Sequence, residues 1–320
     1  MKQLVLGIDI GGTNTAVGLV DCHGEVLAQA AFSTKQFGSP EMLVKGIAES
    51  YHNLASGLLE PVELKAVGIG APNGNYYTGE IAHAPNLRWK GRIRLASMME
   101  EAMGAPAVMT NDANAAALGE MIYGHAKGLE HFIVITIGTG LGSGIVVDGE
   151  MVYGKTGFAG EMGHTTAVRW GRRCSCGKDG CLEAYVSARG LRTTALELLE
   201  EFRYRSLLAE TPPERLNAKA IFDAAMRNDE VAIRAFEFTG EVLGASLADA
   251  VAYTSPEAIF LFGGLAKSGD LLFGPTQRSL DHNLLDIFAG TVKLMPSALN
   301  DQNGAILGAA ALACKTYWKD

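Results

Sequence analysis

The sequence predicts an α/β protein of two packed lobes that carry a duplicated supersecondary unit. Short apolar strands alternate with helical patterns along the chain, which favours the α/β class. A strand, a glycine turn and a second strand occur twice, near residues 4–21 and 132–148. The length of 320 residues is enough for two domains, and no Ser/Gly-rich linker separates the halves. We therefore expect two lobes joined by ordinary elements.

Composition argues against several classes of protein. Hydrophobic residues make up 48% of the chain and charged residues 19%, as in compact globular proteins. The net charge of −8 argues against a nucleic-acid binder, because such proteins carry basic patches. No segment resembles a signal peptide, and no apolar run is long enough to cross a bilayer. We expect a soluble cytoplasmic protein without a nucleic-acid or membrane partner.

The cysteines are unevenly distributed. Three of the five fall within Cys174–Cys181, while Cys22 and Cys314 lie far apart in the sequence. This is not the pattern of a secreted disulfide framework. It predicts reduced thiols with one metal cluster.

The first half of the chain begins with three predicted strands joined by turns. A helix then begins at Ser39, the N-cap, with Pro40 at the first helical position, and ends near Gly57. A strand, a helix, a short strand and an Ala-rich helix follow. The predicted ranges are Leu4–Ile10, Thr15–Asp21, Val26–Phe32, Ala66–Gly70, Arg94–Met103, Ala107–Thr110 and 112 to about Tyr123.

The second half repeats the opening unit with a constant offset of 127 residues. Under this offset Ile8 matches Ile135, Gly11 matches Gly138 and Asp21 matches Asp148. A chance match of Ile and Gly residues would give similar identities, but the shared order of strands and turns favours duplication. Further on, the pattern predicts helices at Ser187–Phe202, Ala218–Arg227, 230–252 and Gly304–Cys314, and a strand at Ala258–Phe262.

The two glycine turns are candidate phosphate-binding loops. Each turn is followed by a strand, whereas a P-loop or a dinucleotide fingerprint requires a helix there. Successive backbone N–H groups bind anions without a helix. A glycine hairpin alone is often just a tight turn, but the pairing at equivalent positions predicts a clamp on one triphosphate. The candidate residues are Gly11, Gly12, Thr13, Asn14, Gly138, Thr139, Gly140 and Gly142.

Two further features extend this candidate nucleotide site. Asp9 directly precedes the first turn, and Thr136 occupies the matching place in the second copy. A single carboxylate beside the phosphates suits Mg²⁺, which prefers oxygen ligands and retains water. Gly263 and Gly264 follow a buried strand and fit close approach of an adenosine ring, although they fit an ordinary turn equally well.

A zinc site is predicted at His164, Cys174, Cys176 and Cys181. These four residues lie in one 18-residue stretch, as His-x9-Cys-x-Cys-x4-Cys. Three thiolates and one imidazole close a tetrahedral shell, and a closed shell leaves no position for catalysis. Gly177 and Gly180 allow the tight folding that aims the sulfurs inward. The metal is therefore expected to be structural.

Carboxylate and amide residues flank these motifs. Asp112 stands where a strand meets a helix, either as an N-cap or as a base that accepts a proton from a substrate hydroxyl. Glu161 and Glu183 lie close to the zinc ligands, either as acceptors for sugar hydroxyls or as ordinary surface carboxylates. Asn86 fits a sugar contact and an ordinary turn equally well.

Taken together, the motifs resemble the ROK family of repressors, open reading frames and sugar kinases. They are Asp9-x-Gly-Gly-Thr-Asn, Asn111-Asp112, Gly138-Thr139-Gly140, Glu161-x-Gly-His164 and Cys174-x-Cys176-Gly-x-x-Gly180-Cys181-x-Glu183. The chain is most similar to the bacterial glucokinases of that family. The resemblance implies an actin-like ATPase fold. Its lobes are expected at residues 1–115 with the final helix 303–320, and at 116–302, where the zinc loop and much of the nucleotide site should lie.

The resemblance also implies an activity and roles for the site residues. The reaction would be ATP-dependent phosphorylation of a hexose 6-hydroxyl, most plausibly of glucose, with Asp112 as general base. Asn86, Asn111, Glu161, His164 and Glu183 would bind the sugar, and His164 would also bind zinc. ATP, Mg²⁺ and structural Zn²⁺ are the expected cofactors, and a homodimer or dimer of dimers the expected assembly.

One segment departs from the family pattern, and several alternatives stay open. Ala71–Tyr77 replaces the usual Pro-Gly turn near the expected sugar pocket. Allose, mannose, fructose or N-acetylmannosamine therefore remain candidate substrates, and polyphosphate remains a candidate donor. A sugar-sensing regulator without catalysis is the alternative from another class. Because the first glycine turn comes within the first dozen residues, we expect no DNA-binding segment before it.

Overall fold

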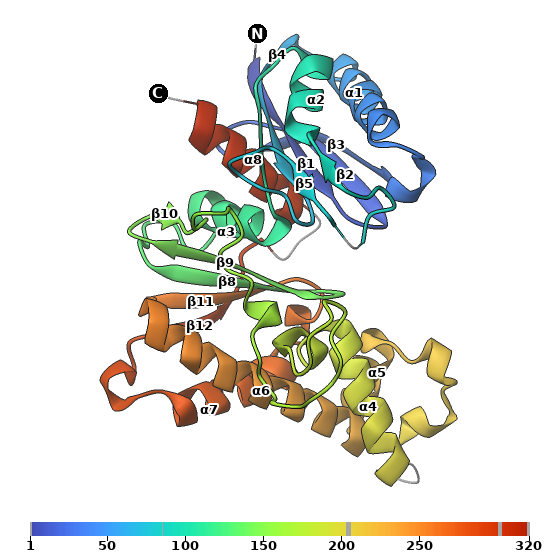
Figure 1. Cartoon of the computed structure of the whole chain (residues 1–320), viewed down its shortest axis with the longest axis vertical. Helices are drawn as coiled ribbons and strands as arrows, with labels where there is room; N and C mark the ends of the chain where they lie inside the picture. Colours follow the sequence, from blue (N-terminus) through green and yellow to red (C-terminus); the bar gives the residue numbers. More distant parts are fainter. Residues whose placement is uncertain (1, 85, 203–205, 300–302, 319–320) are drawn as a thin grey trace. The chain divides into compact units, whose positions relative to one another are not determined.

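The computed structural model describes residues 2–84, 86–202, 206–299 and 303–318 (Figure 1). Internal contacts divide the chain into two compact units. The first unit comprises Met1–Leu129, Gly144–Gly160 and Ser297–Asp320, and the second comprises Glu130–Ser143 and Glu161–Pro296. The predicted lobe boundary at residue 115 falls inside helix α3 (Asp112–Tyr123), which belongs wholly to the first unit.

The first unit is built on a five-stranded sheet with the order β3-β2-β1-β4-β7. Strands β1, β2 and β3 form an antiparallel meander, and β4 and β7 extend the sheet parallel to β1. The strands are β1 (Lys2–Ile10), β2 (Asn14–Val20), β3 (Val26–Ser33), β4 (Val62–Gly70) and β7 (Ala107–Thr110). Because the parallel strands end at one edge, the side chains that follow them are brought close together.

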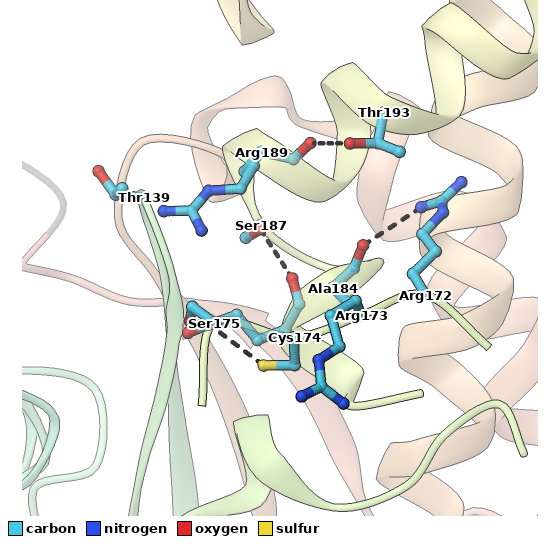
Figure 2. A pocket seen from close by; sticks show the side chains of 10 residues that line it. Thr139, Arg172, Arg173, Cys174, Ser175, Ala184, Ser187, Arg189 and Thr193 are labelled. Carbon is cyan, nitrogen blue, oxygen red and sulfur yellow. Dashed lines mark hydrogen bonds between the residues drawn. The ribbon is translucent and has the colours of Figure 1, made fainter. Parts of the chain in front are cut away.

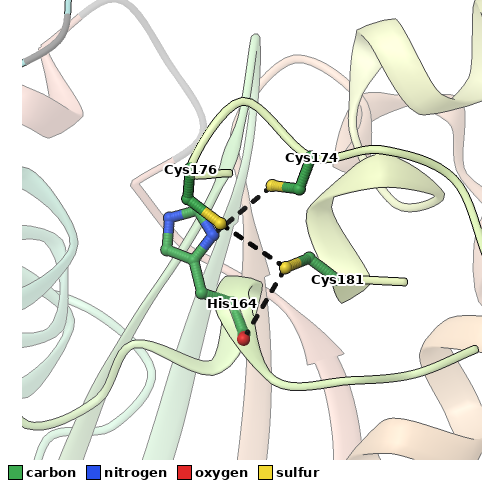
Figure 3. Close-up of side chains that lie close together, drawn as sticks. All are labelled: His164, Cys174, Cys176 and Cys181. Carbon is green, nitrogen blue, oxygen red and sulfur yellow. Dashed lines mark hydrogen bonds between the residues drawn. The ribbon is translucent and has the colours of Figure 1, made fainter. Parts of the chain in front are cut away.

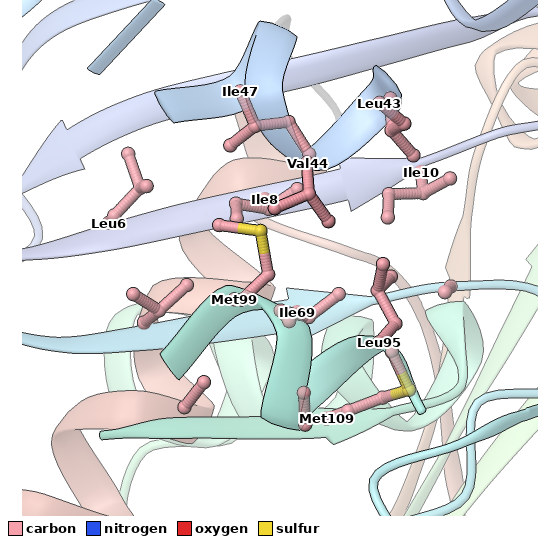
Figure 4. Close-up of a cluster of buried hydrophobic side chains, with 14 of the residues drawn as sticks. Leu6, Ile8, Ile10, Leu43, Val44, Ile47, Ile69, Leu95, Met99 and Met109 are labelled. Carbon is pink, nitrogen blue, oxygen red and sulfur yellow. The ribbon is translucent and has the colours of Figure 1, made fainter. Parts of the chain in front are cut away.

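Helices cover the sheet of the first unit. Apolar residues of α1 (Pro40–Ser56) and α2 (Leu95–Met103) join those of the strands in one buried cluster (Figure 4). Helix α8 (Gly304–Tyr317) packs against β1 and β4 at Gly7 and Gly68, which are partners in register. A Cβ on Gly68 would lie 1.8 Å from the carbonyl oxygen of Ala309, so this close approach requires glycine.

The second sheet repeats the strand order of the first, as β10-β9-β8-β11-β12. It contains β8 (Phe132–Ile137), β9 (Leu141–Val147), β10 (Glu150–Met151), β11 (Ala258–Phe262) and β12 (Lys293–Pro296). As in the first sheet, the last strands are parallel, and the chain passes from the second unit to the first along β9. The matching order confirms the predicted duplication.

The helices of the second unit pack mainly on one another. They are α4 (Ala188–Phe202), α5 (Ala218–Ala225), α6 (Glu230–Thr254) and α7 (Asp270–Asn283). Gly240 and Gly244 allow α6 to approach α7 closely, because a Cβ on Gly244 would lie 2.3 Å from the carbonyl oxygen of Thr276. The 3₁₀ turns among the described residues are η1 (Thr34–Gln36), η2 (Met162–His164), η3 (Leu182–Ala184), η5 (Leu207–Glu210), η6 (Pro213–Arg215), η7 (Ala266–Ser268) and η8 (Asp286–Phe288).

Most predicted elements occur within a few residues of the expected ranges. Ser39 caps α1 as predicted, since its hydroxyl accepts a hydrogen bond from the amide of Met42. Helix α7 and strand β12 were not predicted, nor was the short pair β5 (Ile81–Ala82) and β6 (Arg92–Ile93). Pro275 inside α7 obscures the helical pattern, because proline normally interrupts a helix.

The prediction that Cys22 and Cys314 are reduced thiols is wrong in this structure. A disulfide joins them and ties the turn after β2 to helix α8 within the first unit. The two residues are 292 positions apart, and only the fold brings their Cα atoms within 5.9 Å. Sequence spacing could not reveal this pair.

Among the described residues, no helix has the length and apolar character needed to cross a membrane.

Candidate active site and metal centre

Two carboxylates meet at the carboxyl edge of the first sheet. Asp9 lies in β1 and is paired in register with Gly70 of β4, which is in turn paired with Thr110 of β7. Asp112 follows β7 by two residues. A Cβ on Gly70 would lie 3.8 Å from both an Asp9 carboxylate oxygen and the Asp112 Cα. Glycine on the middle strand thus leaves the space between the two acids open.

Both carboxylates are shifted toward their neutral forms. Burial raises the pKa of Asp9 to about 7, and the charge of the neighbouring Asp112 contributes to that rise. Burial also raises the pKa of Asp112, although the amide of Ala113 donates to its carboxylate at 3.0 Å. Water still reaches the exposed Asp112 side chain, but the protein around it disfavours the charge. Shifted carboxyl groups of this kind are typical of functional sites.

Asn111, not Asp112, caps helix α3. The side-chain oxygen of Asn111 accepts a hydrogen bond of 2.7 Å from the amide of Asn114. Asp112 is therefore the first residue of the helix, and the capping alternative for it is wrong. Its carboxylate is left for another role.

The first glycine hairpin presents unpaired amides. Its carbonyls are occupied, since the Gly11 amide donates to Asn14 O, and Thr34 donates to the carbonyls of Gly11 and Thr13. In the described part of the chain, the amides of Gly12 and Thr13 donate to no protein acceptor. Asn86 packs on this hairpin, because a Cβ on Gly12 would lie 2.6 Å from its carbonyl oxygen.

The second hairpin presents two unpaired amides at the equivalent positions. The Gly138 amide donates to Gly140 O, and the Leu141 amide donates to the Glu183 carboxylate at 3.0 Å. The amides of Thr139 and Gly140 have no acceptor among the residues that the structure describes. With the offset of 127, they match Gly12 and Thr13. Gly142 lies beyond this pair, inside β9.

Gly263 and Gly264 lie where β11 ends. Gly263 has a φ of +105°, and a Cβ there would lie 2.7 Å from the carbonyl oxygen of Ile137, just before the second hairpin. Gly264 has open space around it. Gly263 is thus required for packing beside the hairpin, and only Gly264 leaves room for a ligand.

The four predicted metal ligands converge in the second unit (Figure 3). One ligand atom from each of His164, Cys174, Cys176 and Cys181 lies within 4.8 Å of the others. The sulfurs of Cys176 and Cys181 are 3.6 Å apart, and Cys174 Sγ lies 3.7 Å from His164 Nδ1. Zn–S bonds of about 2.3 Å in a tetrahedron place sulfurs about 3.8 Å apart, so the set fits zinc.

The protonation state of the cluster depends on the metal. Burial and the neighbouring thiols raise the pKa of Cys181 to about 12, so without a metal this thiol keeps its proton, and metal binding would release it. Gly177 and Gly180 have positive φ, and a Cβ on Gly180 would lie 1.7 Å from the carbonyl oxygen of Val168. The loop therefore needs glycine at Gly180 to fold around its ligands.

The predicted sugar ligands of the second unit surround the metal cluster. Glu161 is exposed and begins the turn that carries His164. Because Nδ1 of His164 faces the cluster, Nε2 is the nitrogen left for another partner. Glu183 is half-buried, and its carboxylate accepts from Leu141 N at 3.0 Å and from the Ser175 hydroxyl at 3.2 Å. Glu183 thus links the zinc loop to the second glycine hairpin, which sequence analysis did not predict.

The unusual segment Ala71–Tyr77 is anchored by contacts that the sequence did not reveal. Asn75 is buried and its amide donates to Thr156 O at 2.7 Å, while Tyr76 stacks on Tyr153 at 4.1 Å. Thr110, which lies two residues before Asp112, is close enough to the Tyr153 hydroxyl to influence its pKa.

A family model described as the ROK family matches residues 5–316.

The chain belongs to the ROK family. It is 32% identical to a glucokinase of Thermotoga maritima, over 97% of each chain. The fold matches the crystal structure of a ROK family glucokinase from Streptomyces griseus in complex with glucose and AMPPNP, with a TM-score of 0.82, 32% identity and coverage of 98% and 99%. It is also 28% identical to the xylose repressor of Bacillus subtilis, over 96% of this chain and 76% of the repressor.

Proposed function

We propose that the protein is an ATP-dependent hexose kinase that phosphorylates the 6-hydroxyl of its sugar, with glucose as the first candidate. The observation that carries this proposal is the equivalent pair of free amides in the two glycine hairpins. Two such nests suit a phosphate chain, which needs several N–H donors. The likeness to glucokinases over nearly the whole chain supports the same activity.

The glycine hairpins and Asp9 are assigned to the phosphoryl donor. The hairpin amides and the hydroxyls of Thr13 and Thr139 bind the phosphates of ATP. Asp9 is assigned to Mg²⁺ through bound water, because its carboxylate precedes the first hairpin directly. Mg²⁺, when bound, neutralises charge on the phosphates and holds Asp9 in its ionised form.

Five polar residues are assigned to the sugar. Amide, imidazole and carboxylate groups bind vicinal hydroxyls, and they are offered here by Asn86, Asn111, Glu161, His164 and Glu183. Zinc, when bound to its four ligands, holds Glu161, His164 and Glu183 in position and supplies no chemistry. Its contribution is the shape of the loop.

Asp112 is assigned as the general base. Its carboxylate accepts the proton of the 6-hydroxyl while the oxygen forms a bond to the γ-phosphorus. The bond between that phosphorus and the bridging oxygen breaks, and ADP leaves with the bonding electrons. Phosphoryl transfer has a loose transition state, so most of the rate enhancement comes from positioning and charge stabilisation.

The decisive test is phosphoryl transfer by the purified protein and its Asp112→Asn variant. We expect ADP release with glucose, and a loss of turnover of about 10³-fold or more in the variant. Glucose binding, measured by calorimetry, should remain nearly intact because the amide occupies the same space. Turnover close to that of the wild type would remove Asp112 from this role. A panel of sugars and donors, compared by kcat/KM, selects the hexose and separates ATP from polyphosphate.

The alternative is a regulator that senses sugar without catalysis. The likeness to the xylose repressor favours it, since the family includes both kinds of protein. The shifted carboxyl of Asp112 favours the kinase, because a sensor has no need of a base. Sugar binding without ADP release from any donor in the panel would support the regulator.

Location and assembly belong to the same proposal. We propose that the protein acts in the cytoplasm, where ATP is available, as a homodimer or dimer of dimers. Light scattering of the purified protein measures the assembly.

A further inference from the structure

A pocket of about 290 Å³, lined mainly by residues with polar or charged side chains, lies beside the second glycine hairpin (Figure 2). Its lining includes one residue of the hairpin, one of the zinc loop and three at or near the start of α4, namely Thr139, Ser175, Ser187, Arg189 and Thr193. The amide of Ala188 donates to Gly138 O at 2.8 Å, so the helix start is fixed to the hairpin. The pocket is therefore part of a connected structure rather than a gap between loose loops.

Three arginines line the pocket, but two of them are already paired. Arg172 donates to Glu197 and to the Thr194 hydroxyl, and its guanidinium lies 4.6 Å from the centre of the Tyr185 ring. Arg173 forms a 3.1 Å ion pair with Asp179. These guanidinium groups hold the zinc loop and its surroundings in place.

Arg189 is different. Its side chain is exposed and extends toward Thr139 in Figure 2. Among the residues that the structure describes, its guanidinium has no hydrogen-bond or ion-pair partner. An arginine presents several donors in a fixed fork that matches the oxygens of a phosphate. This cation lies on the same pocket as the Thr139 hydroxyl and next to the free Thr139 amide.

One carboxylate also lines the pocket. The two oxygens of Glu183 already accept from the Leu141 amide and the Ser175 hydroxyl. Both oxygens of Glu183 are therefore already hydrogen-bonded, to the hairpin and to the zinc loop. The N–H and O–H donors of Arg189 and Thr139 stay available to a ligand. Donors without partners around an open pocket of this size are suited to an anion of several oxygens.

We propose that Arg189 binds a phosphate group of the phosphoryl donor in this pocket, together with Thr139. The inference rests on the proposed kinase function and names the part of the donor that the site recognises. The ligand chemistry is a chain of phosphates, which a nucleoside triphosphate and inorganic polyphosphate share.

The test measures binding and turnover separately. Binding of ADP, GDP and tripolyphosphate to the wild type, Arg189→Gln, Arg189→Lys and Arg227→Gln is measured by calorimetry at low and high salt. Arg227 is exposed in the same unit and does not line the pocket, so its variant is the matched control for the loss of one charge. We expect Arg189→Gln to weaken all three ligands by a similar factor of about ten, with a smaller salt dependence. Arg189→Lys should keep part of the affinity that Arg189→Gln loses, and Arg227→Gln should bind all three ligands as the wild type does.

The three ligands distinguish a contact of Arg189 with phosphate from a contact with the ribose or the base. Loss of ADP and GDP affinity with unchanged tripolyphosphate affinity would overturn the phosphate contact in favour of the ribose or base. Unchanged affinity for all three would overturn the inference, even where turnover of the wild type supports the kinase. Arg189-dependent binding of tripolyphosphate by a protein without any turnover would support the inference and reject the kinase. In an active enzyme, Arg189→Gln should raise the KM for ATP and leave the KM for glucose unchanged.

Discussion

The two glycine hairpins share one backbone arrangement but are held in different ways. In the first hairpin, Thr34, the residue that follows β3, holds the turn in place by donating hydrogen bonds of 2.8 Å to the carbonyls of Gly11 and Thr13. In the second, the carboxylate of Glu183 accepts from Leu141 N, so that the turn is fixed from the zinc loop. The first hairpin depends on its own sheet, and the second depends on the loop that carries the four predicted metal ligands.

The chemistry at the strand before each turn differs as well. Asp9 precedes the first hairpin, whereas Thr136 stands at the matching position of the second. Duplication thus preserved the pair of free amides, and divergence placed the acids in one copy and the metal loop beside the other. A gene duplication can therefore keep a shared ligand geometry while separating charge from structural support.

The largest effect should follow removal of zinc. Chelation removes the metal, and Cys176→Ser removes one of its ligands, so either change should release the loop that carries Glu183. The second hairpin then loses its support from Glu183, while the first hairpin keeps its support from Thr34. We expect sugar affinity, donor affinity and stability to fall together, with a loss of unfolding free energy of about 3 kcal/mol or more. Calorimetry and thermal unfolding measure these quantities. A zinc-free protein with full activity and stability would contradict the structural role of the metal.

Asp9 should make the stability of the first unit depend on pH. With its pKa raised to about 7, the folded chain keeps a proton that the unfolded chain loses, so stability falls as pH rises from about 4 to 7. The ceiling of this loss is about 4 kcal/mol. Asp9→Asn should reduce that slope, unfold at a higher temperature at pH 8 and lose activity. The slope that remains is expected from Asp112, whose pKa burial also raises. Thr136→Val, at the matching position, should leave the slope unchanged, and an Asp9→Asn variant with the same slope as the wild type would reject the assignment.

The disulfide should stabilise the first unit. Its closure of a loop of nearly the whole chain predicts that Cys22→Ser lowers the free energy of unfolding by about 2–4 kcal/mol. Cys314→Ser should have the same effect, and the double variant should add little. The denatured, metal-free wild type should show three reactive thiols. Five reactive thiols in protein purified without reductant would show that the bridge does not form under those conditions.

The smallest effects should come from single methyl groups at the hairpins. Gly12→Ala places a Cβ 2.6 Å from the backbone oxygen of Asn86, and Gly140→Ala places one 2.4 Å from a side-chain oxygen of Glu183. Because backbone yields less easily than a side chain, we expect Gly12→Ala to cost about 1–3 kcal/mol and Gly140→Ala less. Gly140→Ala should instead raise the KM for ATP by moving Glu183. Gly38→Ala, whose nearest contact is a flexible Met42 side chain at 3.7 Å, is the control. Equal effects in both hairpins would contradict the difference in support.

Sequence analysis was most successful where the determining interactions are local. The cap at Ser39 and the boundary at Asn111 lie within one helical turn of the residues they affect. The four zinc ligands lie in 18 residues, so their spacing alone predicted the cluster that the structure brings together. The same locality explains the error at α7, where Pro275 obscured a helix that packing against Gly240 stabilises.

The sequence by itself therefore determined the α/β class, the duplicated hairpins and the set of candidate metal ligands, because each depends on neighbours along the chain. Only the tertiary structure decided the rest. The disulfide joins residues 292 positions apart, and the link from Glu183 to Leu141 joins segments 42 positions apart. The raised pKa of Asp9 depends on its burial and on the nearby charge of Asp112. These two residues lie on either side of Gly70, which belongs to the strand between them. Such properties arise from distances in space, which no spacing along the sequence encodes.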